Sequence, residues 1–130
     1  MTGSPSFPLP TDLELFTAYN LFIKPIVTTE TFRKIALSFP GTEERPHFER
    51  RAFKVMKGKI FASLLEENET ANIKCSVDDQ SIYCSFDKKH IYPVPNKFGS
   101  QGWTTFELHH LTEEIVADAL YAASKVGHKK

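Results

Sequence analysis

Basic side chains gather in two segments of the sequence, and they are the residues best suited to bind an anion. The first segment, residues 45–59, holds six Arg and Lys residues against one acid, Glu49. The second, residues 88–105, holds three lysines and no acid. Cations neutralise phosphates, and aromatic rings offer stacking platforms for nucleobases. If folding brings the two segments together, the sequence predicts a positive surface beside Trp103 or Phe98.

The candidate nucleic-acid-binding residues are cations of these segments, one lysine between them, and the tryptophan. They are Arg50, Arg51, Lys54, Lys57, Lys59, Lys74, Lys97 and Trp103. A structural interpretation competes with this one, because Lys and Arg on exposed hairpins also prevent sheets from pairing edge to edge. A tryptophan likewise often packs as a cap over a sheet edge.

Histidines and cysteines do not form a recognisable reactive group. His109 and His110 are adjacent, and neighbours in a strand point to opposite faces, so the pair predicts no metal site. Cys75 lies on the inward face of a predicted strand, where cysteine behaves as a small apolar residue. Cys84 could lie beside His90, but that spacing alone does not establish a catalytic dyad.

Acidic pairs and glycine motifs add no catalytic signature. Glu43-Glu44 and Glu66-Glu67 have no companion base in the sequence, and loop carboxylates in water rarely have the shifted pKa that acid-base catalysis needs. The sequence has no dinucleotide-binding, P-loop or nucleophile-elbow motif. We therefore predict a protein that is not an enzyme, with no catalytic residues, no metal ligands and no cofactor.

Length and composition are typical of one folded domain. The chain has 130 residues, with 16 basic and 16 acidic side chains. This balance excludes disorder caused by charge excess and gives no general attraction to phosphate, so nucleic-acid binding requires charge segregation on the surface. The two cysteines are too few for a secreted disulfide framework, which favours a cytoplasmic location.

The elements that would position these side chains begin with a helix. Thr28 or Thr29 caps it, and an apolar stripe faces inward until Pro40-Gly41 ends it. After a loop through Pro46 the pattern changes to alternation, with Lys57-Gly58 as a tight turn between two strands. A polar turn at residues 66–69 leads to a third strand over residues 71–77, whose alternate residues include an inward Val77.

The second half of the chain predicts a helix, a loop, a strand and a helix. Asp78 or Asp79 caps a short helix that ends near Phe86. Pro93 and Pro95 exclude regular structure for several residues, and residues 96–103 have the glycines of a loop. Alternation returns over residues 103–108, and Thr112 caps a final helix whose buried face starts at Ile115.

Together these elements predict an α+β fold: a helix, an antiparallel meander, a short helix, further strands and a C-terminal helix, with the long helices on one face of the sheet. Residues 28–130 form this single domain. Residues 1–27 are an extension of uncertain role, in which residues 13–23 could form a short docking or self-association helix, or part of a poorly ordered tail. An upstream translation start is a further alternative. A signal peptide is disfavoured because no basic residue precedes Lys24.

Several short stretches resemble the MmcQ/YjbR family of small bacterial proteins. They are Phe39-Pro40-Gly41, Gly58-Lys59-Ile60-Phe61-Ala62, Asn72-Ile73-Lys74-Cys75, and Asn96-Lys97 followed by Trp103-Thr104. The resemblance covers residue 28 to the end and implies an α-β(3)-α-β(2)-α fold. It also implies DNA binding through a proposed double-wing motif, although no agreed activity is attached to the family. The glycine-rich residues 97–103 depart from the pattern of many members, in which a lysine is followed closely by His-Trp.

The leading hypothesis is therefore a non-enzymatic module that binds DNA through a basic hairpin or wing surface. Such binding should weaken steeply as salt increases, because each neutralised phosphate releases counterions. The alternative is a protein-interaction or small-ligand module that uses an open sheet face and Trp103. A membrane partner is not expected, because the apolar stretch near the N-terminus is too short to span a bilayer.

Overall fold

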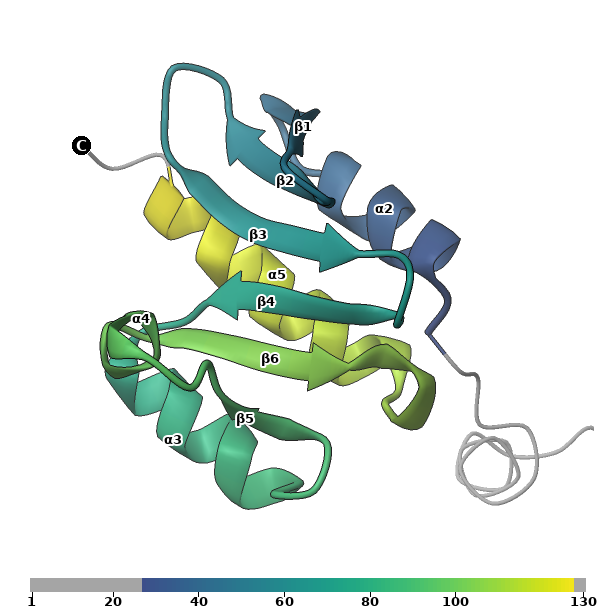
Figure 1. Ribbon diagram of the computed structural model, residues 1–130. Helices are drawn as coiled ribbons and strands as arrows, with labels where there is room; N and C mark the ends of the chain where they lie inside the picture. Colours follow the sequence, from purple (N-terminus) through teal and green to yellow (C-terminus); the bar gives the residue numbers. More distant parts are fainter. Residues whose placement is uncertain (1–26, 128–130) are drawn as a thin grey trace, which may run out of the picture.

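A six-stranded antiparallel sheet forms the centre of the protein. The computed structural model describes residues 27–127, and the predicted helix over residues 13–23 lies outside them. The strands are β1 (Thr42–His47), β2 (Arg50–Val55), β3 (Ile60–Leu65), β4 (Thr70–Lys74), β5 (Ile91–Pro93) and β6 (Trp103–Glu107). Their order across the sheet is β1-β2-β3-β4-β6-β5, so the chain crosses from β4 to the far edge before it returns (Figure 1).

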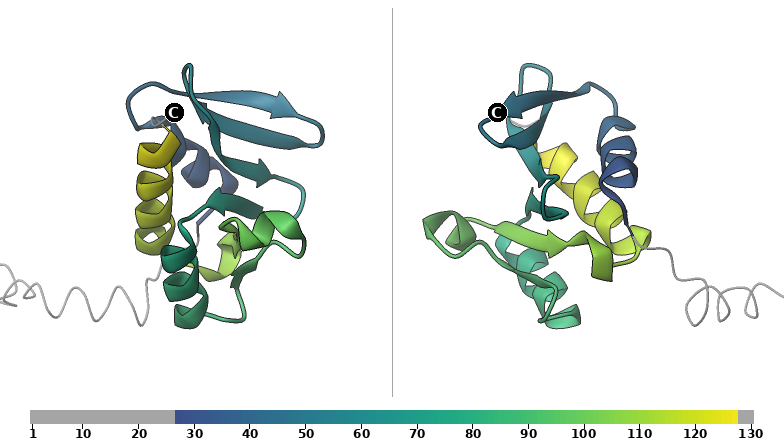
Figure 2. Two further views of the ribbon diagram at one scale, coloured as in Figure 1. Left: turned by 90° about the vertical axis from the view of Figure 1, so that its left-hand side faces the viewer. Right: turned by 45° about the vertical axis from the view of Figure 1, so that its right-hand side comes forward.

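Three helices cover one face of this sheet, and this confirms the predicted α+β fold. They are α2 (Thr29–Leu37), α3 (Val77–Phe86) and α5 (Glu113–Gly127). In Figure 2, α5 and α3 stand on one side of the strands, while the short helix α4 (Lys97–Ser100) projects on the other side. The face that carries α4 is called the open face below.

The core lies between the sheet and these helices. Phe53, Leu64, Ile73 and Phe106 point from the strands toward the helices and are fully buried. The helix residues buried against them are Phe32, Ala36, Val116, Ala119, Leu120 and Ala123. Burying a side chain of this size contributes about 1.5–3 kcal/mol each, so the covered face holds most of the apolar stabilisation.

The N-terminal half follows the predicted pattern, with one added strand. Thr28 caps α2, because its side chain accepts a hydrogen bond from the backbone N–H of Thr31 at 3.0 Å. The turns at Lys57-Gly58 and residues 66–69 lie where the sequence placed them. Residues 42–47 form β1 rather than the predicted loop. They lack an apolar face because β1 is an edge strand, and Pro46 is tolerated there since an edge strand has unpaired backbone groups.

Three details of the second half correct the sequence prediction. Ser76, not Asp78 or Asp79, caps α3, so Val77 begins a helix and is 59% exposed instead of facing inward. Ile91–Pro93 pair with β6 as the short edge strand β5, so Pro93, which was predicted to exclude regular structure, ends a strand at the edge of the sheet, where a missing backbone donor is tolerated. The predicted loop contains α4, whose first turn is capped by the Asn96 side chain. Among the described residues, no helix is long and apolar enough to cross a membrane.

Candidate functional site

Arg50 and Arg51 are adjacent in β2 and point to opposite faces of the sheet. This follows from the period of two in a strand. Arg51 lies opposite Leu64, a core residue, and therefore faces the helices. Arg50 lies opposite His47 at the end of the β1–β2 hairpin and faces the open side. The two arginines thus have different surroundings and cannot share one function.

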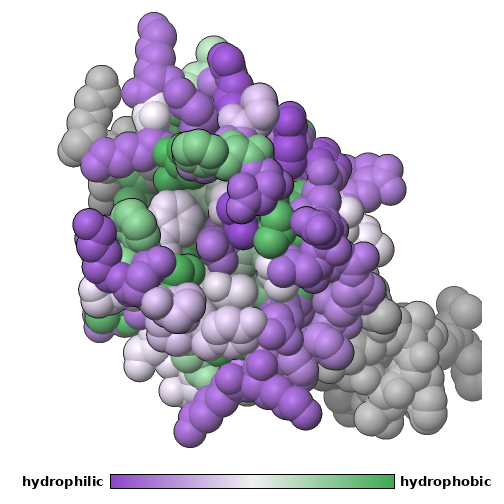
Figure 3. Space-filling model, viewed as in Figure 1, coloured by the Kyte–Doolittle hydropathy of each residue, from purple (hydrophilic) through white to green (hydrophobic). Residues whose placement is uncertain are grey.

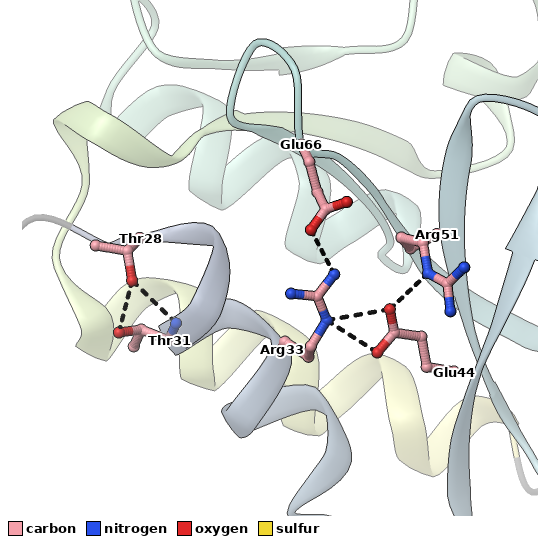
Figure 4. Close-up of polar contacts among 6 residues, drawn as sticks. All are labelled: Thr28, Thr31, Arg33, Glu44, Arg51 and Glu66. Carbon is pink, nitrogen blue, oxygen red and sulfur yellow. Dashed lines mark hydrogen bonds and ion pairs between the residues drawn. The ribbon is translucent and has the colours of Figure 1, made fainter.

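Arg51 belongs to an ion-pair network between the sheet and α2 (Figure 4). Its Nε donates to Glu44 Oε2 at 2.6 Å, and Arg33 Nε donates to the other Glu44 oxygen at 2.9 Å. Arg33 also donates from Nη2 to Glu66 at 2.6 Å, and this hydrogen bond raises the pKa of Arg33. The network joins α2 to β1, β2 and the β3–β4 turn, so Arg51 has a structural partner.

Arg50 lies in the wall of a pocket on the open face. The pocket has a volume of about 310 Å³. Residues of β1, β2, β3, β4 and β6 line it, together with residues of the segment around α4. Figure 3 views this side of the molecule and shows apolar patches set among hydrophilic side chains. The residues that line it are His47, Arg50, Ile60, Ser63, Asn72, Val94, Asn96, Phe98 and Trp103. None of these lining residues is acidic.

The polar groups of the pocket are mainly hydrogen-bond donors. Arg50 donates from Nε to the Ser63 hydroxyl oxygen at 2.9 Å, which leaves the Ser63 proton free to donate onward. Asn72 accepts from the Thr105 hydroxyl at 2.7 Å, so its amide N–H groups are the part left for a ligand. Arg50 Nη2 is buried and has no hydrogen-bond partner among the described residues. Loss of hydration lowers the pKa of Arg50, although the nearby Glu49 opposes this change.

A buried donor without a partner is uncommon in folded proteins and costs about 1–3 kcal/mol. An anion at Arg50 would accept a hydrogen bond from Nη2 and so remove this cost, and its negative charge would stabilise the charged guanidinium. The pocket therefore suits a ligand that carries a negative group and an apolar or aromatic part.

The segment around α4 forms the aromatic wall, and Gln80 of α3 holds it in place. The Gln80 amide is 8% exposed and donates to the carbonyls of Gly99 at 2.9 Å and Trp103 at 3.2 Å. Gly102 adopts a φ of +108°, and a Cβ added there would lie 1.9 Å from the Cys75 carbonyl oxygen. Only glycine lets the backbone at residue 102 lie so close to the backbone of Cys75. Trp103, the next residue, is thereby placed at the start of β6 beside the pocket.

A family model described as YjbR matches residues 37–123 of the chain. The match spans more than half of the sequence and includes the whole sheet. The chain belongs to the YjbR family. The chain is similar to the crystal structure of Deinococcus radiodurans protein DR2400, which is described with the family domain DUF419. The comparison gives a TM-score of 0.69 and 20% sequence identity, and it covers 82% of each chain. At this identity the likeness shows a shared fold. No curated protein matches the chain.

The YjbR fold brings some of the predicted cations together on the open face and separates others. Lys54 and Lys74 share that face with Arg50, and Trp103 lies directly opposite Lys74. Lys74 donates from Nζ to the Gln101 carbonyl at 2.8 Å. Lys97 lies in α4, with its Nζ 5.8 Å from the centre of the Phe98 ring. Lys57 and Lys59 occupy the β2–β3 turn at one end of the sheet, and Arg51 lies on the opposite, covered face.

The sequence analysis did not identify the uncharged polar residues that line this pocket of the YjbR domain. His47, Ser63, Asn72 and Asn96 come from four separate segments, and only their positions in the folded sheet relate them. Alternation offers one signal: Ser63 is a polar residue between the core residues Ala62 and Leu64, so its side chain must face away from the helices.

The cysteines of this YjbR domain have surroundings that oppose reactivity. Burial raises the pKa of Cys75 to about 12 and also raises the pKa of Cys84. A nucleophilic cysteine needs the opposite change, since the thiolate is the reactive form. His90 Nδ1 contacts Asp87 at 3.0 Å, and no hydrogen bond joins Cys84 to His90 among the described residues. The considered Cys-His dyad thus has no support in the geometry.

Proposed function

We propose that this YjbR domain is a non-enzymatic nucleic-acid-binding module, and that the pocket on its open face takes one unpaired nucleotide. The observation that carries the proposal is the Arg50 guanidinium, whose buried Nη2 has no hydrogen-bond partner among the described residues, in a pocket with no acid among its lining residues. Trp103 and Phe98 line the same pocket, so a phosphate at Arg50 would have an aromatic wall for its base nearby.

The shape of the site favours a single strand over a duplex. A base inside a duplex is stacked on both sides, and entry into a pocket requires that it be unstacked, which costs a few kcal/mol. A pocket volume of about 310 Å³ is at the lower end of the range for small-molecule sites and suits one nucleotide better than several. We therefore expect DNA or RNA to bind with an exposed base.

Cations around the pocket supply contacts for neighbouring phosphates. Lys54 of β2 lies opposite Ile60 and Lys74 of β4 lies opposite Trp103, both of which line the pocket, and Lys97 is next to the lining residue Phe98 in α4. Arg45 also belongs to the open face, but it pairs with Glu43 at 3.2 Å and contributes less free charge. These side chains would contact phosphates and not base edges, so they would increase the affinity and its salt dependence without creating a sequence preference.

The direct test is a fluorescence-anisotropy titration of the full chain with a labelled single strand and with its duplex. We expect the single strand to bind more tightly, with the logarithm of affinity falling linearly with the logarithm of salt between about 50 and 200 mM. Trp103 is the single tryptophan of the chain, and its emission should be quenched on binding. Lys54→Ala should weaken binding, while Lys88→Ala, in the exposed turn after α3, is the matched charge control.

Absence of binding to either nucleic acid at low salt would reject the proposal. Equal effects of Lys54→Ala and Lys88→Ala would also reject it, because affinity would then depend on net charge alone.

A free small anion with an aromatic ring is the second candidate, favoured by the confined volume of the pocket. Such a ligand would fill the Arg50 pocket without using the lysines around it. A nucleoside monophosphate should then raise the melting temperature of the protein, because it binds only the folded state. Its affinity should have a shallow salt dependence and should not change in Lys54→Ala, which distinguishes it from an oligonucleotide.

A further inference from the structure

Two histidines and a glutamate converge at the other end of β6, away from Trp103. Ile91 pairs with Phe106, so His90, just before β5, meets Glu107 at the end of β6. The backbone N–H of Glu107 donates to the His90 carbonyl at 2.9 Å. The 3-10 turn η1 (Leu108–His110) then folds back and stacks the His110 ring on the His90 ring, with centroids 4.2 Å apart.

The ligating atoms of His90, Glu107 and His110 all lie within 4.8 Å of one another. His90 and Glu107 are partly buried, and His110 is exposed. The sequence had directed attention to His109 and His110, which are adjacent. The structure pairs His110 with His90 instead, twenty residues earlier in the chain, because η1 reverses the direction of β6.

Two of these three side chains are oriented by further polar contacts. Asp87 accepts from His90 Nδ1 at 3.0 Å, so the His90 proton lies on Nδ1 and the lone pair of Nε2 is left available. The Tyr92 hydroxyl donates to Oε2 of Glu107, which leaves Oε1 without that partner. Metal-binding histidines characteristically donate their other ring nitrogen to a carboxylate in this way.

We propose that His90, Glu107 and His110 bind one divalent transition-metal ion, with Asp87 as the positioning residue for His90. Two imidazoles and one carboxylate suit Zn²⁺ and Fe²⁺, whereas Mg²⁺ and Ca²⁺ prefer sites built from oxygen ligands alone. Three protein ligands leave at least one coordination position for water or another ligand, since zinc sites of this type have four.

The His110 ring must rotate out of its stack on His90 to close the site around an ion, because the planes of the two rings are only 15° apart and their lone pairs do not converge. Metal–nitrogen distances of about 2.1 Å place two ligand atoms of a tetrahedral site about 3.4 Å apart. The His110 side chain is exposed, which leaves its ring room to turn toward the ion. The open coordination position would face a cavity of about 470 Å³, which is lined by Asn68, Glu69, Thr70, Glu107, His109 and His110.

This metal site is separate from the nucleotide pocket. Trp103 and Glu107 are both outward-facing residues of β6, and four residues of strand place them about 13 Å apart. Loss of metal binding therefore leaves the nucleic-acid proposal standing, and the reverse also holds.

The test is a titration of the metal-free full chain with Zn²⁺ in competition with a chromogenic chelator. We expect one equivalent to bind, and Co²⁺ to give visible absorption bands at the same stoichiometry. His90→Ala and His110→Ala should each abolish or strongly weaken binding, and Asp87→Asn should weaken it about 10- to 100-fold. His47→Ala is the matched control, because His47 is exposed on β1 at the opposite edge of the sheet.

Circular-dichroism melting of each variant checks that it remains folded. Zn²⁺ should raise the melting temperature of the wild type and of His47→Ala, and should leave that of His110→Ala unchanged. Wild-type affinity no higher than that of the His90→Ala/His110→Ala double variant would overturn the proposal. So would an equal loss in His47→Ala, since the ion would then be bound by scattered surface histidines.

Discussion

Arg50→Ala and Arg51→Ala provide the sharpest test of the site, because both changes remove one positive charge from neighbouring positions of one strand. Any effect of net charge on nucleic-acid binding is therefore the same in both variants. The variants differ in the face of the sheet that they alter. We expect Arg51→Ala to lower stability and spare binding, and Arg50→Ala to lower binding and largely spare stability.

The stability effect of Arg51→Ala follows from its contact with Glu44. A hydrogen bond to a charged group contributes about 1.5–3 kcal/mol. The Arg51 side chain is 36% exposed, so solvent screens this pair, and Glu44 keeps its contact with Arg33 in the variant. A cost of about 1–2 kcal/mol remains, which lowers the melting temperature by about 5–10 °C in a domain of this size.

Arg50→Ala involves opposing contributions to stability. The variant loses the hydrogen bond to Ser63, and it also removes the buried Nη2 that has no partner among the described residues. These terms are each about 1 kcal/mol and of opposite sign, so the melting temperature should change by less than about 5 °C. Binding of a single strand should fall about 10- to 100-fold, because a charge-assisted hydrogen bond to phosphate is lost.

Differential scanning calorimetry and anisotropy titration of the two variants, made in parallel, supply both quantities. An equal loss of affinity in both variants would contradict the proposed site, since binding would then depend on charge and not on the face of the sheet. A larger loss of stability in Arg50→Ala than in Arg51→Ala would contradict the structural role assigned to Arg51.

Three further predictions concern the segment that holds Trp103. Gly102→Ala should destabilise the fold by more than about 1 kcal/mol and shift Trp103 emission, because φ is +108° and a Cβ would meet the Cys75 carbonyl. Gln80→Leu should cost about 1–3 kcal/mol in urea melts, since the carbonyls of Gly99 and Trp103 lose a buried donor. The Cys75 pKa of about 12 lies above the unfolded value of about 8.5, so its contribution to stability should be full below pH 8.5 and decline as pH rises toward 12. Melting curves of Cys75→Ala should show a smaller alkaline decline than those of the wild type, and the raised pKa values of Tyr83 and Tyr92 account for the part that remains.

The elements with an apolar face were predictable from sequence. Phe53 and Val55 alternate with Lys54, and Ala71 and Ile73 alternate with Asn72, so both strands are visible from the pattern alone. The start of the first helix was predicted with Thr28 or Thr29 as its cap, and the structure has Thr28 as the cap. Strand β1 was missed because its six residues, Thr42 to His47, include no buried side chain, and pairing with β2 is what makes them a strand.

The candidate site was less predictable, for a different physical reason. The basic segments identified Arg50 and Lys54 without indicating which face of the sheet the helices cover. Alternation alone requires Arg50 and Arg51 to diverge, but the partner of Arg51 is Glu44, in the strand that the sequence did not reveal. The predicted surface of cations therefore included one arginine that has a structural role.

The same alternation explains how a small domain keeps two candidate sites without weakening its core. Ser63, Asn72 and Thr105 lie side by side across three neighbouring strands, and all face away from the helices. On β6, the outward positions on either side of Thr105 are Trp103, in the proposed nucleotide pocket, and Glu107, in the proposed metal site. Because one strand carries both residues, a change that shifts the register of β6 would disturb both proposed sites and could not tell one from the other. Arg50→Ala and His110→Ala lie outside β6, on β2 and η1, so each tests one site while the strand that supports the other stays in place.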